Sequence, residues 1–256
     1  MINIKSKEEV EIMKKGGAIL AQVMREVLEH VKPGVSELDL ENLANDLILK
    51  KGAYSGFKKV EGYKYATCLA TNDVVVHGLP KDNKLKEGDI IGIDCGVYLG
   101  GFHTDMAETL RVKSQISNHK SQMDKVDRFL ETGKRALNEA IKMAKPGNRI
   151  GHISQAIQDI IEREGYSVVR NLVGHGVGKK LHEDPEIPGF VYEKIEKTPL
   201  IKEGMTLAIE VIYNMGKKDI KTDNDGWTIR TRDGSLSGLF ERSVVVTKNG
   251  PIILTN

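Results

Sequence analysis

Two phrases of the sequence occur twice, in the same order and at nearly the same offset. LKEGDIIGIDCGVY (residues 85–98) returns as IKEGMTLAIEVIYN (residues 201–214), which aligns Asp94 with Glu210 at an offset of 116. KPGVSELDLENLANDLILKKGAYSG, from residue 32, returns as KPGNRIGHISQAIQDIIEREGYSVV, from residue 145, at an offset of 113. One such match could be chance, but two ordered matches favour a duplicated helix-then-strand unit. We expect a single domain over residues 1–256, with pseudo-symmetric halves at about 1–115 and 120–256.

Capping signals and apolar spacing predict two helices in each half. A capping box at residues 6–9 precedes apolar residues at helical spacing, which continue to the Lys-Pro-Gly stop at residues 32–34. A second helix begins at the Ser-x-x-Asp of residues 36–39 and ends at Gly52. The second half repeats the pattern with the apolar residues Phe129, Leu137, Ile141, Ile153, Ile157 and Ile160.

Short β-rich runs bounded by Gly, Asn or Asp follow each helix pair. They include TCLATNDVVVHG, DIIGIDCG, GFHTDMAETLRV, TLAIEVIY, GWTIRTRD and FERSVVVTKNGPIIL. We expect an α+β fold in which helices cover an antiparallel sheet. The polar stretch VKSQISNHKSQMDK (residues 112–125) separates the two halves and suits a surface connection.

Composition and charge exclude several classes of function. With 256 residues, 39% hydrophobic and 29% charged, the chain can bury a sizeable core. A net charge of +2, without any Lys/Arg block longer than a pair, gives little reason to expect DNA as a partner. No run approaches a signal peptide or the roughly 18 apolar residues of a membrane span, so we expect a cytoplasmic protein without a membrane partner. Cys68 and Cys95 form no CxxC pattern and are expected to be thiols.

Two carboxylates lie in the run IIGIDCGVYLGGFHTDMAETL. A two-residue turn at Leu99-Gly100 would pair residues whose numbers sum to 199, and so would place Asp94 opposite Asp105. Directly opposed side chains have Cβ atoms about 4.5–5.5 Å apart, where like charges are destabilising unless a cation lies between them. The pair therefore predicts a metal site.

Three further residues extend this pattern. Glu210 in LAIEVI and Glu241 in LFERSVVV interrupt apolar runs, where an unpaired carboxylate is costly to bury. Each carboxylate alone is more often a solvated strand residue or half of an ion pair, but four together favour a shared cation. His175 lies between glycines in GHGVG, where we expect a turn that lets the imidazole reach a metal. The segment lacks the spacing and the Lys-Ser/Thr ending of a phosphate loop.

The ordered set Asp94, Asp105, His175, Glu210 and Glu241, with His77 in NDVVVHGLP and His182 in LHEDP, resembles the bacterial-type, type I methionine aminopeptidases. The five predicted ligands are spaced 11, 70, 35 and 31 residues apart inside matching phrases, and the resemblance spans nearly the whole chain. It implies the pita-bread metallopeptidase fold. It also implies a hydrolase that removes the initiator methionine from nascent polypeptides by hydroxide attack at a dinuclear metal centre.

The same resemblance implies which residues hold the ions. Asp105 and Glu241 would bridge two divalent ions, Asp94 would bind one of them, and His175 with Glu210 would bind the other. Four carboxylates and one imidazole suit Co²⁺, Mn²⁺ or Fe²⁺, and affinity alone does not choose among these metals.

It also implies roles around the ions. Glu210 would accept and pass on the proton of the attacking water, and the substrate's free amine would bind near Asp94. His182 would donate to the developing oxyanion and His77 would contact the next amide, neither being a ligand. The methionine side chain would fill a slot beside His77, with plain core packing as the alternative role of its residues. That slot comprises Tyr63, Cys68 and Trp227.

Five residues depart from the family pattern. Gly96 and Met106 stand where a hydroxyl residue is common, and Lys64 stands where proline is usual. Leu181 replaces an aromatic residue before His182, and Arg242 replaces a frequent histidine. The predicted ligands are unaffected, and the departures bear on how the substrate is positioned.

Three alternatives compete with this interpretation. An Xaa-Pro aminopeptidase or dipeptidase shares the fold and ligands but usually carries a large N-terminal domain, whereas the first predicted helix here starts almost at Met1. A non-catalytic pita-bread binding protein would typically have lost a ligand. Type II methionine aminopeptidases carry a helical insertion for which the spacings of 35 and 31 leave no room. We expect a minimal, monomeric enzyme that acts on nascent polypeptides, with the ribosome as a candidate partner.

Overall fold

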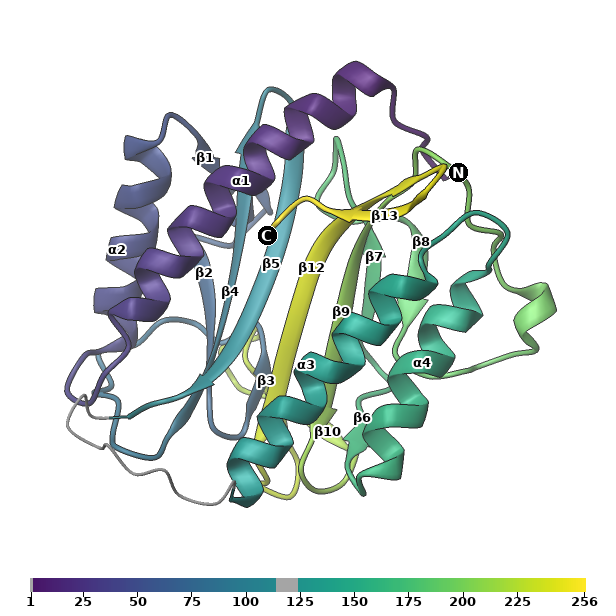
Figure 1. Cartoon of the computed structure of the whole chain (residues 1–256). Coiled ribbons are helices and arrows are strands. Elements are labelled where there is room, and N and C mark those ends of the chain that lie inside the picture. The colour runs from purple at the N-terminus through teal and green to yellow at the C-terminus, as the bar shows by residue number, and fades with distance from the viewer. Residues whose placement is uncertain (1, 114–123) are drawn as a thin grey trace.

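The computed structural model describes residues 2–113 and 124–256 (Figure 1). Most of the predicted polar connection at residues 112–125, which includes residues 114–123, lies outside the described residues. The described parts alternate helix pairs with antiparallel strands, which confirms the predicted α+β class.

The four α-helices of the described residues begin and end close to the predicted signals. The Ser6 hydroxyl accepts from the backbone N–H of Glu9, whose carboxylate accepts from the N–H of Ser6, so the predicted capping box is confirmed. Ser36 and Asp39 form the same reciprocal pair at the second helix. The helices are α1 (Lys7–Glu29), α2 (Glu37–Lys50), α3 (Lys125–Met143) and α4 (Ile150–Arg163), and two 3-10 turns are η1 (Phe57–Lys59) and η2 (Ile195–Lys197).

A ten-stranded antiparallel sheet forms the centre of the molecule. Its main path is β1-β4-β5-β12-β9-β7-β8, with β2 beside β4, β6 beside β9 and β13 beside β12. A smaller sheet has the order β10-β11-β3. The strands are β1 (Tyr54–Ser55), β2 (Thr67–Thr71), β3 (Val74–Val76), β4 (Ile90–Leu99), β5 (Phe102–Arg111), β6 (Ser167–Val168), β7 (Val173–Gly176), β8 (Glu183–Pro188), β9 (Thr206–Asn214), β10 (Ile220–Thr222), β11 (Ile229–Thr231), β12 (Ser237–Thr247) and β13 (Gly250–Ile253). The short strands β1, β6, β7, β8 and β10 lie outside the predicted runs, because they are too short or too rich in Gly and Pro to show alternation.

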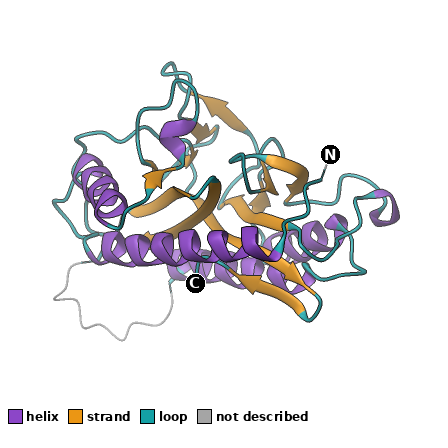
Figure 2. Cartoon of the chain, turned by 90° about the horizontal axis from the view of Figure 1, so that it is seen from above, coloured by secondary structure: helices purple, strands orange, loops and turns teal. Residues whose placement is uncertain are grey.

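Two long helices cover one face of the sheet. α1 packs on β4 and β5, while α3 packs on β9 and β12, as Figures 1 and 2 show. In α3, a Cβ atom at Gly133 would lie only 2.5 Å from the Phe240 ring and the Tyr213 hydroxyl, so glycine permits this close approach. The opposite face of the sheet carries the four carboxylates that the sequence predicts as metal ligands.

Structural details repeat at the same two offsets as the sequence. An isolated bridge joins Ser36 to Lys84 in the first half, and another joins Arg149 to Leu200 in the second. These pairs differ by 113 and 116 residues, the offsets of the two repeated phrases. The turn glycines Gly34 and Gly147 both have a φ of 90°. These correspondences support the internal duplication, which we propose as the origin of the two halves.

The β4–β5 hairpin has a different register from the predicted one. Leu99 pairs with Phe102, so the turn is Gly100-Gly101 and paired residue numbers sum to 201 rather than 199. Both turn glycines have positive φ, 56° and 92°, as a type I′ turn requires, whereas Leu99 would be strained there. Asp94 therefore pairs with Ala107, and Asp105 pairs with Gly96. The prediction that the two aspartates are directly opposed is wrong, although they remain diagonal neighbours on one face.

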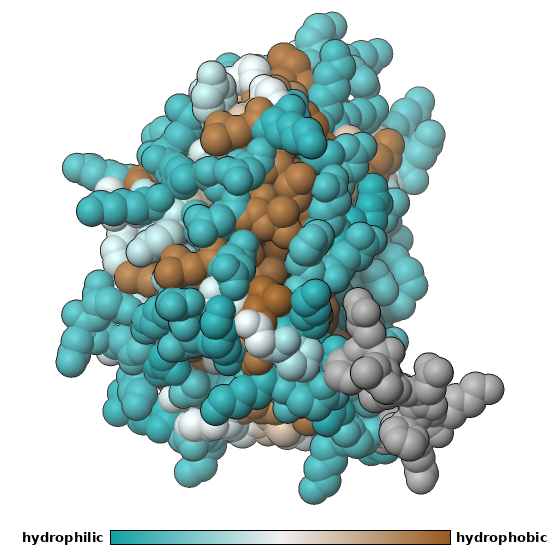
Figure 3. All heavy atoms as spheres, turned by 90° about the vertical axis from the view of Figure 1, so that its left-hand side faces the viewer, coloured by the Kyte–Doolittle hydropathy of each residue, from teal (hydrophilic) through white to brown (hydrophobic). Residues whose placement is uncertain are grey.

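The outer surface is mainly hydrophilic on the side next to α2. Figure 3 shows this side with a band of hydrophobic atoms between hydrophilic ones. Leu49 of α2 and Tyr54 of β1 are 52% and 66% exposed. Within the described ranges, no helix combines the length and apolarity that crossing a bilayer requires.

Candidate metal centre

A row of side chains crosses the sheet on the face opposite α1 and α3. The register pairs Asp94 of β4 with Ala107 of β5, Ala107 with Glu241 of β12, and Glu241 with Glu210 of β9. Asp105 lies two residues before Ala107 and therefore shares its face. The register therefore places all four carboxylates on one face of three adjoining strand pairs.

His175 approaches this row from a strand, not from a turn. It lies on β7 and pairs with Ala208 of β9, so the predicted glycine-bounded turn is wrong. Gly174 and Gly176 serve close packing instead, since Cβ atoms there would lie 2.6 Å from the Ala208 carbonyl oxygen and 2.2 Å from that of Asp184. The irregular β7–β8 register between these glycines accompanies the same crowding.

The imidazole of His175 is held in a metal-binding tautomer. Its Nδ1 lies 2.9 Å from the carbonyl oxygen of Gly176, an acceptor, so Nδ1 carries the proton and Nε2 keeps a free lone pair. Nε2 lies 3.4 Å from Oε1 of Glu210. Burial, with the nearby His182, lowers the pKa of His175 to about 4, so the ring is neutral at pH 7.

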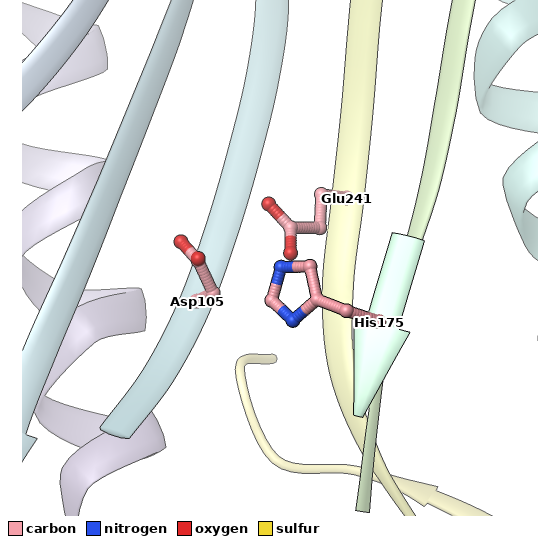
Figure 4. Close-up of side chains that lie close together, drawn as sticks. All are labelled: Asp105, His175 and Glu241. Carbon is pink, nitrogen blue, oxygen red and sulfur yellow. The ribbon is translucent and has the colours of Figure 1, made fainter. Parts of the chain in front are cut away.

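Three strands bring candidate ligand atoms close together. One atom from each of Asp105, His175 and Glu241 lies within 4.8 Å of the others, and Figure 4 shows the three side chains converging from β5, β7 and β12. All three residues are buried, with 4%, 6% and 2% exposure respectively. Asp94 and Glu210 line the same cavity.

The carboxylates are arranged at an electrostatic cost. Burial raises the pKa of Asp105 to about 7. Burial first, and repulsion from neighbouring carboxylates second, raise the pKa of Asp94, Glu210 and Glu241 well above their usual range. Oδ1 of Asp94 and Oε1 of Glu241 are buried without a hydrogen-bond partner among the described residues. Such orphaned anionic oxygens are costly unless a cation binds them.

The donor set fits divalent metal ions. Four carboxylates carry four negative charges when ionised, which two divalent cations would neutralise. Carboxylate oxygens with one imidazole nitrogen suit hard or borderline ions of the first transition row. The free lone pair on His175 and the unpartnered oxygens of Asp94 and Glu241 agree with this chemistry.

We predict that metal-free protein becomes less stable as pH rises from 6.5 to 8.0. Folding raises the pKa of the four buried carboxylates, so the folded protein holds their protons more tightly than the unfolded chain does. Such groups stabilise the native state fully below the pKa of the unfolded chain. That stability is lost as pH rises through the pKa of the folded state. Each proton retained only by the folded state costs roughly 1.4 kcal/mol per pH unit. Urea unfolding with a chelator present should show the decline, and added Mn²⁺ should reverse most of it at pH 8.0.

This pH window avoids an opposing effect from His175. Its lowered pKa costs stability only as pH falls below about 6.5. Asp105→Asn should flatten the decline, because that variant removes one titrating group. Stability that is constant or increases from pH 6.5 to 8.0 in metal-free protein would contradict the buried-carboxylate account.

An apolar slot opens onto the carboxylates within one cavity of about 300 Å³. Cys68 pairs with Asp94 across β2 and β4, so it lies in the carboxylate row. The rings of Tyr63 and Trp227 lie 5.0 Å apart at 63°, and the Tyr63 hydroxyl donates to the Thr67 carbonyl oxygen at 2.7 Å. Cys68 and Cys95 are free and buried, which confirms the prediction of thiols.

His77 and His182 line the same cavity as the carboxylates. The ring of His182 lies 4.4 Å from that of His175 at 72°. His77 has a φ of 55°, an unfavourable conformation for a non-glycine residue, which indicates a position held for its side chain. Burial lowers the pKa of both His77 and His182, so both rings are neutral at pH 7.

The structure gives a place to each of the five residues that depart from the family pattern. A Cβ atom at Gly96 would lie 2.7 Å from the Phe57 ring, so glycine makes room for an aromatic wall of the cavity. Met106 and Arg242 pair across β5 and β12 on the helix-covered face, away from the carboxylates. Leu181 lines the cavity directly, and Lys64 is exposed.

Several walls of the cavity were not predicted from sequence. Apolar residues at strand ends and in loops look like ordinary core residues, and only tertiary contacts show that they face a cavity. They include Phe57, Val60, Val76, Leu172 and Ile212, with Asn171 as a polar member.

Comparisons with known proteins agree with this geometry. Residues 11–248 match the sequence model of metallopeptidase family M24. A methionine aminopeptidase of Clostridium perfringens is 42% identical over 255 residues, covering 100% of this chain and 99% of that protein. The crystal structure of methionine aminopeptidase from Thermotoga maritima has a TM-score of 0.93 at 40% identity, with 100% of both chains covered.

A prolidase has the same fold in a longer chain. The prolidase from Pyrococcus furiosus has a TM-score of 0.76 at 25% identity, covering 99% of this chain but 65% of its own. Methionine aminopeptidases and prolidases share the pita-bread fold, so the predicted fold class is confirmed.

Proposed function

Because this chain belongs to metallopeptidase family M24, on the methionine aminopeptidase branch that its sequence predicted, we propose that it is a methionyl aminopeptidase. It is a hydrolase that removes the initiator methionine from nascent polypeptides. One observation carries the proposal: a single cavity joins an apolar slot to a buried cluster of carboxylates and an imidazole. We further propose that it acts in the cytoplasm, as expected for an enzyme whose substrates are nascent polypeptides, and that it acts as a monomer.

Two divalent ions, Co²⁺, Mn²⁺ or Fe²⁺, would be held by five side chains. By the family resemblance, Asp105 and Glu241 would contact both ions, while Asp94 would bind one. His175 and Glu210, which lie 3.4 Å apart, would bind the other. When bound, such ions acidify water and polarise a carbonyl group at neutral pH. Ligand convergence and the free lone pair on His175 support this assignment.

Four side chains would position the substrate and move its protons. The carboxylate of Glu210 would accept a proton from the attacking water and deliver it to the leaving amine. The free α-amine of the substrate would bind near Asp94 and one ion, which restricts cleavage to chain ends. His182 would donate to the oxyanion that develops on the scissile carbonyl, and His77 would contact the following amide.

The apolar slot would recognise the methionine side chain. Tyr63, Cys68 and Trp227 supply aromatic and sulfur surface, which suits a flexible thioether. Tyr63 and Cys68 are 6% and 5% exposed, so a bound side chain would be largely shielded from water. Binding by apolar contact selects for shape and excludes charge.

We predict that Met-Ala and Met-Gly peptides are cleaved and that Leu-Pro peptides are hardly cleaved. One methylene or sulfur in an apolar pocket changes binding by only about 1–3 kcal/mol, so norleucine should be tolerated at the first position. Lys or Asp at that position should not be, because the slot offers no partner for a buried charge. Measuring kcat/KM on peptides that differ only in their first two residues tests this.

The same panel tests the alternative suggested by the fold of the prolidase. Faster cleavage ahead of proline than of Met-Ala, irrespective of the first residue, would favour an Xaa-Pro peptidase. No cleavage of any peptide with metal restored would favour a non-catalytic binding protein.

A further inference from the structure

A second, shallower cavity of about 370 Å³ adjoins the first. The two cavities share Val60, Leu181 and His182, so the second continues outward from the first. The remaining residues that line it are Lys59, His103, Lys179 and Lys180. We call this outer cavity the basic groove.

The basic groove has an excess of positive charge. Lys59 Nζ lies 4.2 Å from the centre of the Tyr98 ring, and no carboxylate in the described ranges pairs with Lys59 or with the side chain of Lys180. Lys179 Nζ lies 3.0 Å from Glu9 Oε1, which neutralises that lysine. Two exposed cations are therefore free to bind an anion.

Glu183, which follows the groove residue His182 in the sequence, is already paired with another lysine. Glu183 Oε2 lies 2.6 Å from Lys5 Nζ, and both side chains are buried, with 3% and 4% exposure. The other oxygen of Glu183 accepts from the backbone N–H of Lys180 at 3.1 Å. Among the described residues that line the groove, none is acidic. His103, which is 5% exposed, adds a wall without negative charge.

We propose that the basic groove binds acidic side chains at the third and fourth residues of the substrate. The inference rests on the proposed function, because it requires the first residue to occupy the apolar slot. With the scissile carbonyl at His182, the border that the two cavities share at Val60, Leu181 and His182 gives the chain after the cleaved bond a route into the basic groove. An extended chain advances about 3.3 Å per residue, so we assign the third and fourth residues, which follow closely after the cleaved bond, to the groove.

Three amidated pentapeptides test the proposal in the metal-loaded enzyme. They are Met-Ala-Asp-Asp-Leu, Met-Ala-Ser-Ser-Leu and Met-Ala-Lys-Lys-Leu, and amidation removes the terminal carboxylate as a competing anion. At low ionic strength kcat/KM should be roughly 2- to 10-fold higher for the acidic peptide than for the neutral one, as expected for two exposed ion pairs. It should be lowest for the basic peptide. Added NaCl should shrink these ratios by screening.

Charge changes in the groove identify the residues responsible. Lys59→Ala combined with Lys180→Ala should bring the acidic-to-neutral ratio towards one, and Lys59→Glu combined with Lys180→Glu should invert it. Lys248→Ala, at an exposed turn between β12 and β13, should keep the parent ratio. Both readouts are ratios on one enzyme preparation, so partial loss of folded protein does not affect them.

The failure of this inference differs from failure of the proposed function. Equal kcat/KM for the three peptides, or a ratio unchanged by the double substitutions, would overturn the inference while leaving methionine removal intact. Failure to cleave any peptide that begins with methionine would instead overturn the proposed function.

Discussion

Asp105→Asn is expected to abolish peptidase activity, by more than about 10³-fold, and to lower the amount of bound metal more than Asp94→Asn does. Asp105 is 4% exposed and its ligand atom meets those of His175 and Glu241. In the proposed centre Asp105 would serve both ions and Asp94 only one, so the two variants should differ in metal content. Elemental analysis after dialysis, with kcat on one Met-Ala peptide, measures both effects.

The folded state of Asp105→Asn should survive without metal. The substitution keeps the shape of the side chain and removes a carboxylate whose pKa is raised by burial, so metal-free stability should not fall. Asp159→Asn, at an exposed position of α4, is the matched control and should keep both metal and activity. Parent-like metal content in Asp105→Asn, or full activity of the chelated parent enzyme, would refute the dinuclear centre.

His182→Ala is expected to keep its metal yet to lose on the order of 10²–10³ in kcat, as other enzymes do when an oxyanion donor is removed. The ring packs 4.4 Å from that of His175 but comes from the loop before β8, outside the three converging ligands. Substrate binding should change less than kcat, since the oxyanion forms only in the transition state. Metal titration and steady-state kinetics on one Met-Ala peptide separate these effects.

His182→Gln provides the matching control, because it retains a donor and should recover part of the lost kcat. A purely packing role for His182 makes a different prediction, namely lower stability with nearly normal turnover. Loss of metal in His182→Ala would make His182 a ligand, and near-normal kcat would remove it from the mechanism.

Local signals in the sequence were sufficient for the helices, the fold class and the faces of the strands. Capping boxes at Ser6 and Ser36 act within four residues, so they do not depend on distant packing. The hairpin prediction failed in register but kept the two aspartates on one face, because the paired sums 199 and 201 differ by two. Side chains alternate with a period of two along a strand, so only a shift by one residue would have reversed the face.

Only the tertiary structure shows how the residues of the site come together. The strand position of His175 depends on pairing with β9 and on crowding at Gly174 and Gly176, neither of which is visible in local sequence. Two aromatic walls of the cavity show the same dependence. Phe57 packs on Gly96, and the ring of Trp227 contacts that of Tyr63, which is far away in the sequence. Residue types and short-range spacing determine which side chains can bind metal and which face of a strand they occupy. The cavity and its cluster of negative charge form only when strands that are far apart in the sequence lie side by side.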